Sequence, residues 1–272
     1  MIPTTDGLFD GITDAEYHQD RDSLSSSGAR QLLRCPAKFR WQQDNPQPHK
    51  DVFDFGSAAH TLVLGKGDAI AAIDSDSWRS KAAQEAREEA RENHQIPLLR
   101  ADYAKAKAMA DAVREHPLAA ELLADGVAEQ SGYWMDDRTW MRLRFRPDWV
   151  TTYRGSPTIV DYKSSVTADP QQFARKAFDF GYHIQQAWYS TGFEAVTGEP
   201  PDFLFIVQEK DAPFLVSVCE FDSAAVKQGQ ADMRAALDVY SACQESGVWP
   251  GYSDDVQSLR LPPWAHKQRR DT

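Results

Sequence analysis

The chain has 272 residues and a formal net charge of −11, because 41 acidic residues outnumber 30 basic ones. This charge argues against a protein that coats nucleic acid through bulk electrostatic attraction, but it is compatible with a local basic groove. No apolar run approaches the roughly 20 residues that cross a bilayer, and the acidic N-terminus lacks the basic-then-apolar order of a secretory signal. We therefore expect a cytoplasmic protein with no membrane partner.

The N-terminal part, residues 1–127, is predicted to be mainly helical. A first helix is expected over Ser25–Gln43, with a serine as its N-cap and a bend at Pro36. A proline-rich loop over Asn45–Lys50 then leads to a second, buried helix over Phe53–Leu64, whose small residues permit close packing.

The helical pattern continues almost without a break over Ser77–Leu123, which is rich in Ala, Glu, Arg and Lys. It is interrupted near Asn93–Pro97 and again at Pro117, and Gly126 is expected to end it. From Ala128 onward the apolar period changes from that of a helix to two, which indicates strands. The helical layer is thus expected to end at this point.

Three strands after this change of period are predicted to form an antiparallel meander: Tyr133–Met135, Trp140–Arg146 and Thr158–Lys163. A helix over Pro170–Thr197 follows, then a hairpin of two strands and a last helix: Phe203–Gln208, Phe214–Phe221 and Ser223–Ser246. This order predicts an α/β fold with a central mixed β-sheet flanked by helices, beneath an N-terminal helical layer.

Basic residues gather in two of these elements. Within the second strand, apolar and basic side chains alternate, so one face of that strand carries Arg142, Arg144 and Arg146. We regard them as candidates for holding a nucleic-acid backbone, and the alternative is that they form the solvent face of the sheet. Arg30 and Arg34 of the first helix are similar candidates for phosphate contacts.

Two acidic residues and a lysine stand out at the ends of neighbouring strands. Asp161 follows the β-branched residues Ile159 and Val160, and Lys163 lies two positions later on the same side of the pleat. A hairpin would bring Asp148 close to Asp161. Two carboxylates and an ammonium group are the minimum equipment for metal-assisted phosphodiester hydrolysis, although an isolated Asp-x-Lys is far more often a strand-end salt bridge.

Several longer segments, taken in order, resemble the successive motifs of one known family. They are LSSSGARQLLRCPAKFRW, FDFGSAAHTLVLG, RLRFRPDWV, IVDYKSS, YHIQQAWYSTGFEAVTG and the ending LPPWA. Together they resemble the RecB-like branch of the PD-(D/E)XK nuclease superfamily, and within it the RecE-like (exonuclease VIII type) enzymes of phages and prophages. The resemblance covers most of the chain. It implies a PD-(D/E)XK core and a single nuclease domain over residues 1–272, with the sheet-containing catalytic part at 128–272.

This resemblance implies roles for individual residues. His60, Asp148 and Asp161 match the metal ligands of the family, and the backbone carbonyl of Tyr162 is an expected further ligand. Lys163 matches the catalytic lysine. The family's QxxxY motif, which contacts DNA or supports the metal site, corresponds to Gln185 and Tyr189, which share one helix face at this spacing. From its apolar neighbours alone, His60 would more often be an ordinary buried histidine than a metal ligand.

The resemblance also implies a cofactor. The expected metal is Mg²⁺, and a nitrogen donor from His60 suits Mn²⁺ as well. Some relatives hold an iron–sulfur cluster through four cysteines, but this chain has three distant ones and no C-terminal group, so no cluster is expected: Cys35, Cys219 and Cys243. This cysteine pattern also encodes neither a disulfide framework nor a zinc site.

The activity implied by the resemblance is a double-strand DNA exonuclease. Such an enzyme would degrade the 5′-ended strand to 5′-phosphorylated products and leave 3′ overhangs for a RecT-like annealing partner. It would act as a ring-shaped homo-oligomer, a trimer or tetramer, in the host cytoplasm if phage-encoded. The alternatives are an endonuclease or single-strand-specific nuclease on the same fold, or a catalytically inactive DNA-binding scaffold.

Overall fold

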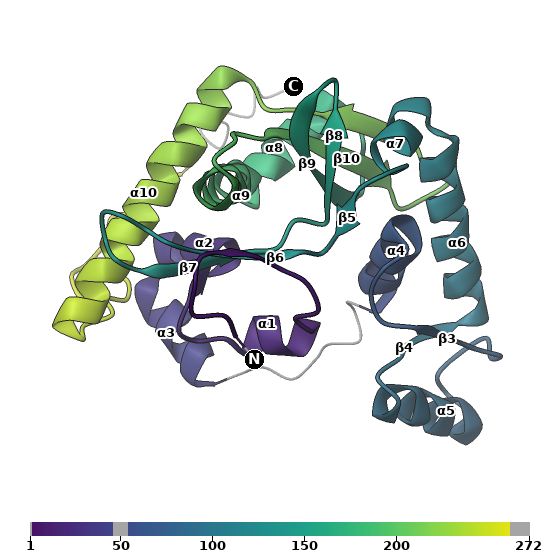
Figure 1. Cartoon of the computed structure of the whole chain (residues 1–272). Coiled ribbons are helices and arrows are strands. Elements are labelled where there is room, and N and C mark those ends of the chain that lie inside the picture. Colours follow the sequence, from purple (N-terminus) through teal and green to yellow (C-terminus); the bar gives the residue numbers. More distant parts are fainter. Residues whose placement is uncertain (1, 46–53, 262–272) are drawn as a thin grey trace, which may run out of the picture.

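The computed structural model describes residues 2–45 and 54–261 (Figure 1). The predicted loop over Asn45–Lys50 lies outside these residues apart from Asn45, and the ending LPPWA lies outside them apart from Leu261. None of the described helices is both long and apolar enough to cross a membrane.

The centre of the molecule is a five-stranded mixed sheet in the order β11-β10-β9-β8-β5. Its longest strand, β9 (Ser156–Ser165), pairs in parallel with β10 (Asp202–Glu209) and antiparallel with β8 (Trp149–Tyr153). The two edge strands are β11 (Val216–Cys219), which pairs antiparallel with β10, and β5 (Val127–Ala128), which pairs antiparallel with β8. The predicted central mixed sheet is therefore confirmed, as is the hairpin of β10 and β11.

Both faces of this sheet are covered by helices, because β9 and β10 carry apolar side chains on both faces. On one face, Ile159 and Phe205 pack against α9 (Tyr182–Thr197) and α10 (Ser223–Ser246). On the other face, Val160, Tyr162 and Ile206 pack against α4, α6 and α7, whose bounds are Asp54–Leu64, Arg100–Glu115 and Pro117–Leu122. The sheet thus lies between two helical layers (Figure 1).

A second sheet has four strands in the order β1-β6-β7-β2, with bounds Gly7–Phe9, Ser131–Met135, Arg142–Phe145 and Leu24–Ser25. The predicted meander is wrong in this respect: β7 pairs with β6, but β9 pairs with β8 in the other sheet. Pro147 lies between β7 and β8 and has no backbone N–H for a ladder, so the chain leaves one sheet and enters the other there.

The N-terminal helices differ from the prediction mainly at their breaks. The helix expected over Ser25–Gln43 is two helices, α2 (Ser26–Arg34) and α3 (Pro36–Asp44), and they meet at Cys35, beside the proline expected to bend them. Ser25 caps α2 by accepting a hydrogen bond from the backbone of Gly28. A short helix, α1 (Asp14–Gln19), precedes them.

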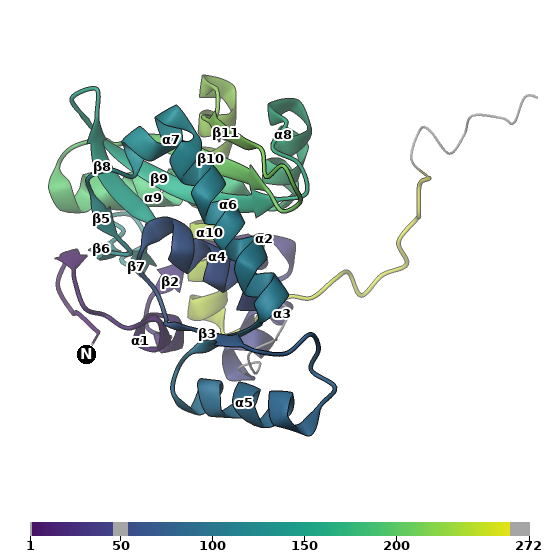
Figure 2. The ribbon, with the colours of Figure 1, turned by 90° about the vertical axis from the view of Figure 1, so that its right-hand side faces the viewer.

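The long helical stretch expected over Ser77–Leu123 contains a strand. Helix α5 (Lys81–Glu92) ends before β4 (Ile96–Leu99), which pairs in parallel with β3 (Ile70–Ile73). Together α5, β3 and β4 form an excursion between α4 and α6 that lies apart from the main sheets (Figures 1 and 2). The helical pattern is therefore interrupted near Asn93–Pro97 because the strand β4 begins there. The strand was not predicted because its sequence, IPLL, contains a proline.

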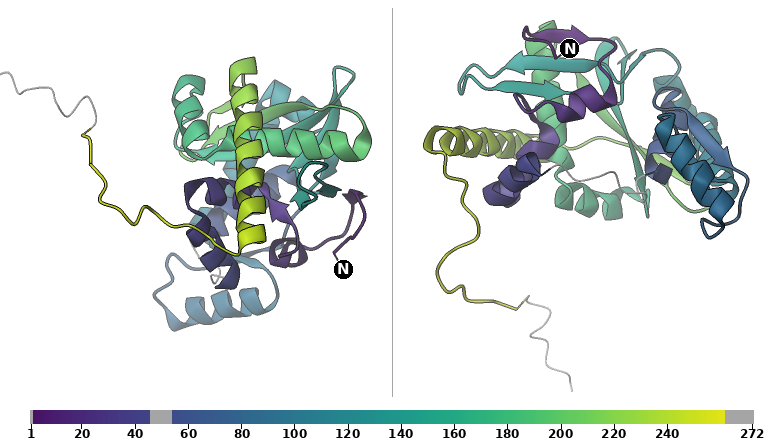
Figure 3. Two further views of the ribbon diagram at one scale, coloured as in Figure 1. Left: turned by 90° about the vertical axis from the view of Figure 1, so that its left-hand side faces the viewer. Right: turned by 90° about the horizontal axis from the view of Figure 1, so that it is seen from below.

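The helix expected over Pro170–Thr197 is also two helices, α8 (Pro170–Asp179) and α9. They are separated at Phe180–Gly181, where Gly181 adopts a φ of +70° that other residues rarely adopt. Helix α10 has the predicted bounds. Beyond it, Trp249 stacks on Phe39 and Tyr252 accepts a hydrogen bond from Lys38. The rest of the described chain, up to Leu261, runs away from the body of the protein (Figures 2 and 3).

Candidate active site

Asp161 and Lys163 lie side by side on the central strand β9. Their alternation with Val160 and Tyr162 places them on the face that α9 covers. The Asp161 side chain is fully buried, and the Lys163 ammonium forms an ion pair with its Oδ2 atom. A lysine and an aspartate thus share a nearly dry site in the middle of the sheet.

Asp148 reaches this site from the start of β8. The pairing of Trp149 with Val160 sets the register of the β8–β9 hairpin, and it brings Asp148 beside the next residues of β9. Asp148 Oδ2 accepts a hydrogen bond of 2.8 Å from the backbone N–H of Tyr162. The Tyr162 side chain points to the opposite face, where its hydroxyl donates to Gln208 over 2.7 Å. The backbone of Tyr162 thus bonds to Asp148, while its ring lies beside that of His60, with centroids 6.3 Å apart.

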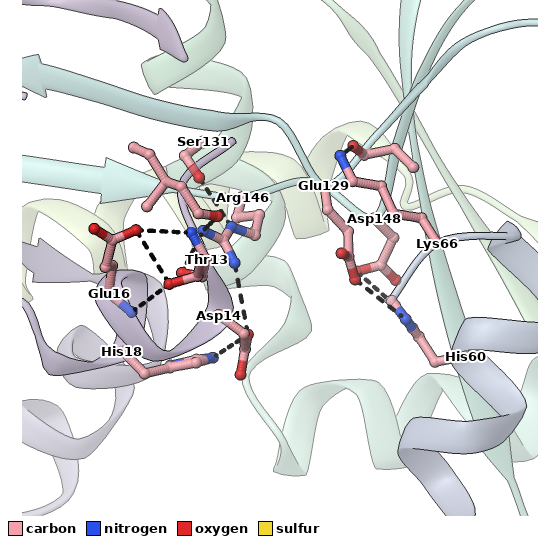
Figure 4. A network of polar contacts seen from close by, with 12 residues as sticks. Thr13, Asp14, Glu16, His18, His60, Lys66, Glu129, Ser131, Arg146 and Asp148 are labelled. Carbon is pink, nitrogen blue, oxygen red and sulfur yellow. Dashed lines mark hydrogen bonds and ion pairs between the residues drawn. The ribbon is translucent and has the colours of Figure 1, made fainter. Parts of the chain in front are cut away.

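His60 comes from the helix α4, far away in sequence. Its Nε2 atom lies 3.2 Å from Asp148 Oδ1, and its Nδ1 atom lies 3.6 Å from Glu129 Oε1 (Figure 4). The histidine therefore bridges two carboxylates and is not packed in an exclusively apolar environment. Glu129 belongs to no motif that the sequence shows, because it simply follows the short strand β5.

The position of Glu129 is fixed by its own backbone. The residue adopts a φ of +51°, in the left-handed region that non-glycine residues seldom occupy. Its N–H donates to the carbonyl of Asp148 over 3.2 Å, and the preceding carbonyl, that of Ala128, accepts 2.7 Å from Lys66 Nζ (Figure 4). Strained backbone held by surrounding contacts occurs frequently at functional sites.

Gln185 and Tyr189 lie on one face of α9, as their spacing requires, but only one of them bonds to the acidic group. Gln185 Nε2 donates a hydrogen bond of 2.7 Å to Asp161 Oδ1. The Tyr189 ring packs against Phe145 and Phe203, with ring centroids 6.0 and 6.4 Å away. The glutamine thus fixes the aspartate, and the tyrosine fixes the helix to the core.

The two aspartates have opposite electrostatic environments. Burial and the neighbouring charge of Asp148 raise the pKa of Asp161 to about 6, although Lys163 opposes the shift. Burial also acts to raise the pKa of Asp148, but His60, Lys163 and the Tyr162 N–H outweigh it, so the net shift is downward. Nearby positive charge and hydrogen bonds therefore outweigh the cost of burying Asp148, but they do not outweigh the cost of burying Asp161.

The two basic groups respond in the corresponding way. Burial lowers the pKa of Lys163, but the charges of Asp161 and Asp148 outweigh it and raise the value. Burial likewise lowers the pKa of His60, and Asp148 and Glu129 reverse the shift. The site therefore groups two basic side chains, His60 and Lys163, with the carboxyl groups of Asp148, Asp161 and Glu129.

The donor chemistry of the site suits a divalent cation. In the described part of the chain, no three His, Cys, Asp or Glu side chains are already arranged to hold a metal ion. The buried Asp161 Oδ2 nevertheless accepts no hydrogen bond from the described residues, although Lys163 is in ion-pair contact with it. Carboxylate oxygens from Asp148 and Asp161 with the Tyr162 carbonyl are hard ligands, and the His60 imidazole adds a nitrogen donor.

The three arginines of β7 and the segment after it do not form an open basic face. Arg142 binds Asp6 over 2.5 Å and also donates to the Thr5 carbonyl, and Arg144 donates to Ser23. Arg146 donates to the Ile12 carbonyl over 3.0 Å. The N-terminal segment covers this face, so neither a free phosphate-holding row nor a solvent face describes these side chains in the structure.

The arginines of α2 also have internal partners. Arg30 Nη1 donates to the carbonyl of Phe180 over 2.9 Å, and Arg34 Nη2 donates to the carbonyl of Asp179 over 2.7 Å. Both side chains therefore hold the connection between α8 and α9. The structure brings His60, Asp148, Asp161, Lys163 and Gln185 together, whereas these arginines lie in supporting positions.

One protein-family model matches most of the chain. Residues 25–262 match the model of a family described as a PDDEXK-like domain of unknown function (DUF3799). The chain belongs to this family. No curated protein matches the sequence significantly. The recognition of a PD-(D/E)XK protein is confirmed.

Two solved structures are similar to this DUF3799 protein to different degrees. A protein from Eubacterium rectale that is provisionally named an exonuclease aligns with a TM-score of 0.62 and 13% identity, covering 95% of this chain and 99% of the other. A phage-related exonuclease from Haemophilus somnus 129PT aligns with a TM-score of 0.34 and 11% identity, over 83% and 96% of the two chains. The first of these shows that the DUF3799 protein shares the fold of the Eubacterium protein.

Proposed function

We propose that this protein is a metal-dependent DNA exonuclease that hydrolyses phosphodiester bonds at the ends of double-stranded DNA. The observation that carries the proposal is the contact between buried Asp161 and Lys163, with Asp148 and His60 beside them. Burying this many charged groups is costly unless a cation and a phosphate complete the site. The nuclease fold of the family supports the same activity.

The residues present define the chemistry. Asp148, Asp161, the Tyr162 carbonyl and His60 would hold a divalent cation, which when bound polarises a phosphate and lowers the pKa of a water ligand. Lys163 orients the attacking water or stabilises the charge that develops on the phosphoryl oxygens. Water adds to phosphorus, the bond to the 3′-oxygen breaks, and a 5′-phosphorylated product leaves. Gln185 keeps Asp161 in place throughout.

The remaining parts of the proposal concern the substrate and partners. We infer digestion of the 5′-ended strand, 3′ overhangs and a RecT-like annealing partner from the resemblance to RecE-like enzymes. A ring-shaped trimer or tetramer that encircles DNA would give processivity without bulk positive charge, which suits the net charge of −11. Arg142 and Arg146 already have partners in the N-terminal segment. This agrees with a protein that does not bind DNA through an open basic face.

A single assay tests the activity. Linear duplex DNA labelled at either the 5′ or the 3′ terminus is incubated with the protein and Mg²⁺, and covalently closed duplex serves as the comparison. We expect mononucleotide release from linear DNA, faster for the 5′ label, and no cleavage of closed circles or in EDTA. Nicking of closed circles would rule out a strict exonuclease, and an Asp161→Ala variant that still cleaves would exclude this site.

A further inference from the structure

An exposed aromatic ring lies beside the active-site lysine. The Phe180 side chain, between α8 and α9, is 55% exposed. Its ring stacks on Tyr182 with centroids 5.7 Å apart and planes at 25°. Lys163 Nζ in turn lies 4.8 Å from the centroid of the Tyr182 ring. Two contacts therefore connect the surface ring to the catalytic lysine.

The backbone that carries Phe180 is held firmly. Arg30 and Arg34 donate to the carbonyls of Phe180 and Asp179, as described above. Gly181 follows with a φ of +70°, and a Cβ atom there would lie 2.8 Å from Arg30 Cδ. A left-handed residue pressed against a partly buried arginine leaves the segment little freedom. The exposed ring is therefore presented in a fixed position rather than on a loose loop.

The ring also continues an aromatic series that begins in the core. Phe205 of β10 is buried, and its ring lies 6.2 Å from that of Tyr182 with planes at 28°. Phe205, Tyr182 and Phe180 are thus successive, nearly parallel rings, and the last of them faces solvent. An isolated exposed phenylalanine needs no explanation. One that extends such a series next to a catalytic lysine offers a flat surface for another planar group.

We propose that Phe180 is the stacking surface for an unpaired nucleobase of the DNA strand being cleaved. The proposal rests on the proposed nuclease function and deepens it. Only two contacts, of 4.8 and 5.7 Å, separate the Phe180 ring from Lys163, so a base stacked on that ring would lie within a few nucleotides of the phosphate at Lys163. A base stacked on protein has left its own helix, so the duplex end must be opened before cleavage.

The test is a thermodynamic cycle between the ring and the base. Affinity is measured in EDTA by fluorescence anisotropy, for a fluorescein-labelled duplex and for duplexes with one abasic nucleotide at each of the first four positions of the 5′ strand. Stacking on an aromatic side chain is worth roughly 1–3 kcal/mol per base, so Phe180→Ala should bind the intact duplex on the order of tenfold more weakly. At one of the four positions, an abasic nucleotide should weaken DNA binding by the wild-type protein by the same factor. It should leave DNA binding by Phe180→Ala unchanged.

Two further variants keep the test specific. Phe180→Tyr retains a ring and should bind like wild type. Phe178→Ala is the matched control, because Phe178 is 63% exposed and also stacks, but on His183, over 5.2 Å. Phe178 lines a pocket with Ala174 and Phe221 to which Phe180 does not contribute, so the Phe178→Ala change should leave the abasic profile as in the wild type.

The proposal is overturned if Phe180→Ala binds DNA as tightly as wild type does. It is also overturned if the loss of affinity in Phe180→Ala, relative to wild type, is the same for every abasic duplex. It is also overturned if Phe178→Ala gives the same coupling. Hydrolysis of the intact duplex by wild type in Mg²⁺ is recorded in parallel. A wild-type protein that binds with the predicted coupling but does not cleave would refute the nuclease function alone, and normal cleavage without coupling would refute the stacking alone.

Discussion

Gln185 donates a hydrogen bond of 2.7 Å to Asp161 Oδ1, while Lys163 contacts the other oxygen of the same carboxylate. The two oxygens thus have separate partners, one from α9 and one from the same strand. This division orients the carboxylate, because a fully buried aspartate bonded on one side can turn only by giving up that bond. Gln185 is for this reason the most direct probe of how the site is positioned.

Replacing Gln185 by Leu should lower activity without unfolding the protein. Partners that orient a metal ligand typically contribute roughly 10- to 100-fold to metal affinity or activity. We expect a loss of this size in Mn²⁺ affinity, measured by calorimetry, and in cleavage rate. Tyr189→Phe serves as the comparison, because the tyrosine ring packs in the core and makes its contacts through the ring. Equal losses in both variants would show that Gln185 only supports the helix.

Replacing Lys163 by Ala should abolish cleavage and largely preserve metal binding. The lysine is placed to stabilise charge on the phosphate, and removing one such group typically lowers a rate on the order of 100- to 1,000-fold. Single-turnover cleavage and Mn²⁺ calorimetry measure the two effects separately. Unchanged hydrolysis would remove the catalytic assignment of this residue.

His60→Ala should weaken Mn²⁺ binding and cleavage together, because the imidazole is one of the expected ligands. Glu129→Gln should have a smaller effect in the same direction, since Glu129 contacts only the far nitrogen of the ring. Roughly tenfold weaker Mn²⁺ binding is expected for the glutamine variant. If His60→Ala lowers the melting temperature but leaves metal affinity unchanged, the histidine serves the fold alone.

Arg142→Gln should loosen the N-terminal segment and leave DNA binding unchanged. Arg142 holds Asp6 and nearby carbonyls, so its loss should speed limited proteolysis before β1. A phosphate contact would instead show itself in the salt dependence, where each lost contact changes the slope of log affinity against log salt by about 0.9. A shallower slope in this variant would mean that the side chain turns to bind DNA.

Asp136→Asn should destabilise the protein at neutral pH and much less in acid. Burial raises the pKa of Asp136, but Arg234 at 2.6 Å and the Thr139 N–H at 2.9 Å outweigh it, so the folded-state pKa is lowered. The stabilisation is therefore present above the unfolded value of about 3.9 and is lost as pH falls through the folded value. Denaturant unfolding should show a difference of about 2 kcal/mol at pH 7 that shrinks below about pH 4.

The sequence predicted the centre of the site better than its surroundings. Asp161 and Lys163 were expected on one face because side chains alternate along a strand, and their ion pair shows that they are. Asp148 was expected beside them through a hairpin, which exists even though its first strand, β8, was not recognised. His60 was a candidate only through the family resemblance, since no spacing rule connects a helix residue with a strand so distant in sequence.

What the sequence did not predict depends on contacts between distant segments. The arginines were expected on one face of their strand, but nothing local indicates that Asp6 and the Ile12 carbonyl would contact them. Glu129 was missed because its left-handed backbone, rather than any motif, turns it toward His60. The prediction of a single meander was wrong because the chain passes from one sheet to the other at Pro147. The alternation of apolar and polar residues does not reveal this change of sheet.

The excursion formed by β3, β4 and α5 has a practical value. Helix α5 packs on those two strands and projects from the molecule, well apart from β9 (Figures 1 and 2). Its outer side chains include Glu85 and Glu89, which are exposed. A dye, a spin label or a tether attached there would leave the opposite end of the protein unobstructed. Immobilised molecules could then be watched individually as they shorten a stretched DNA.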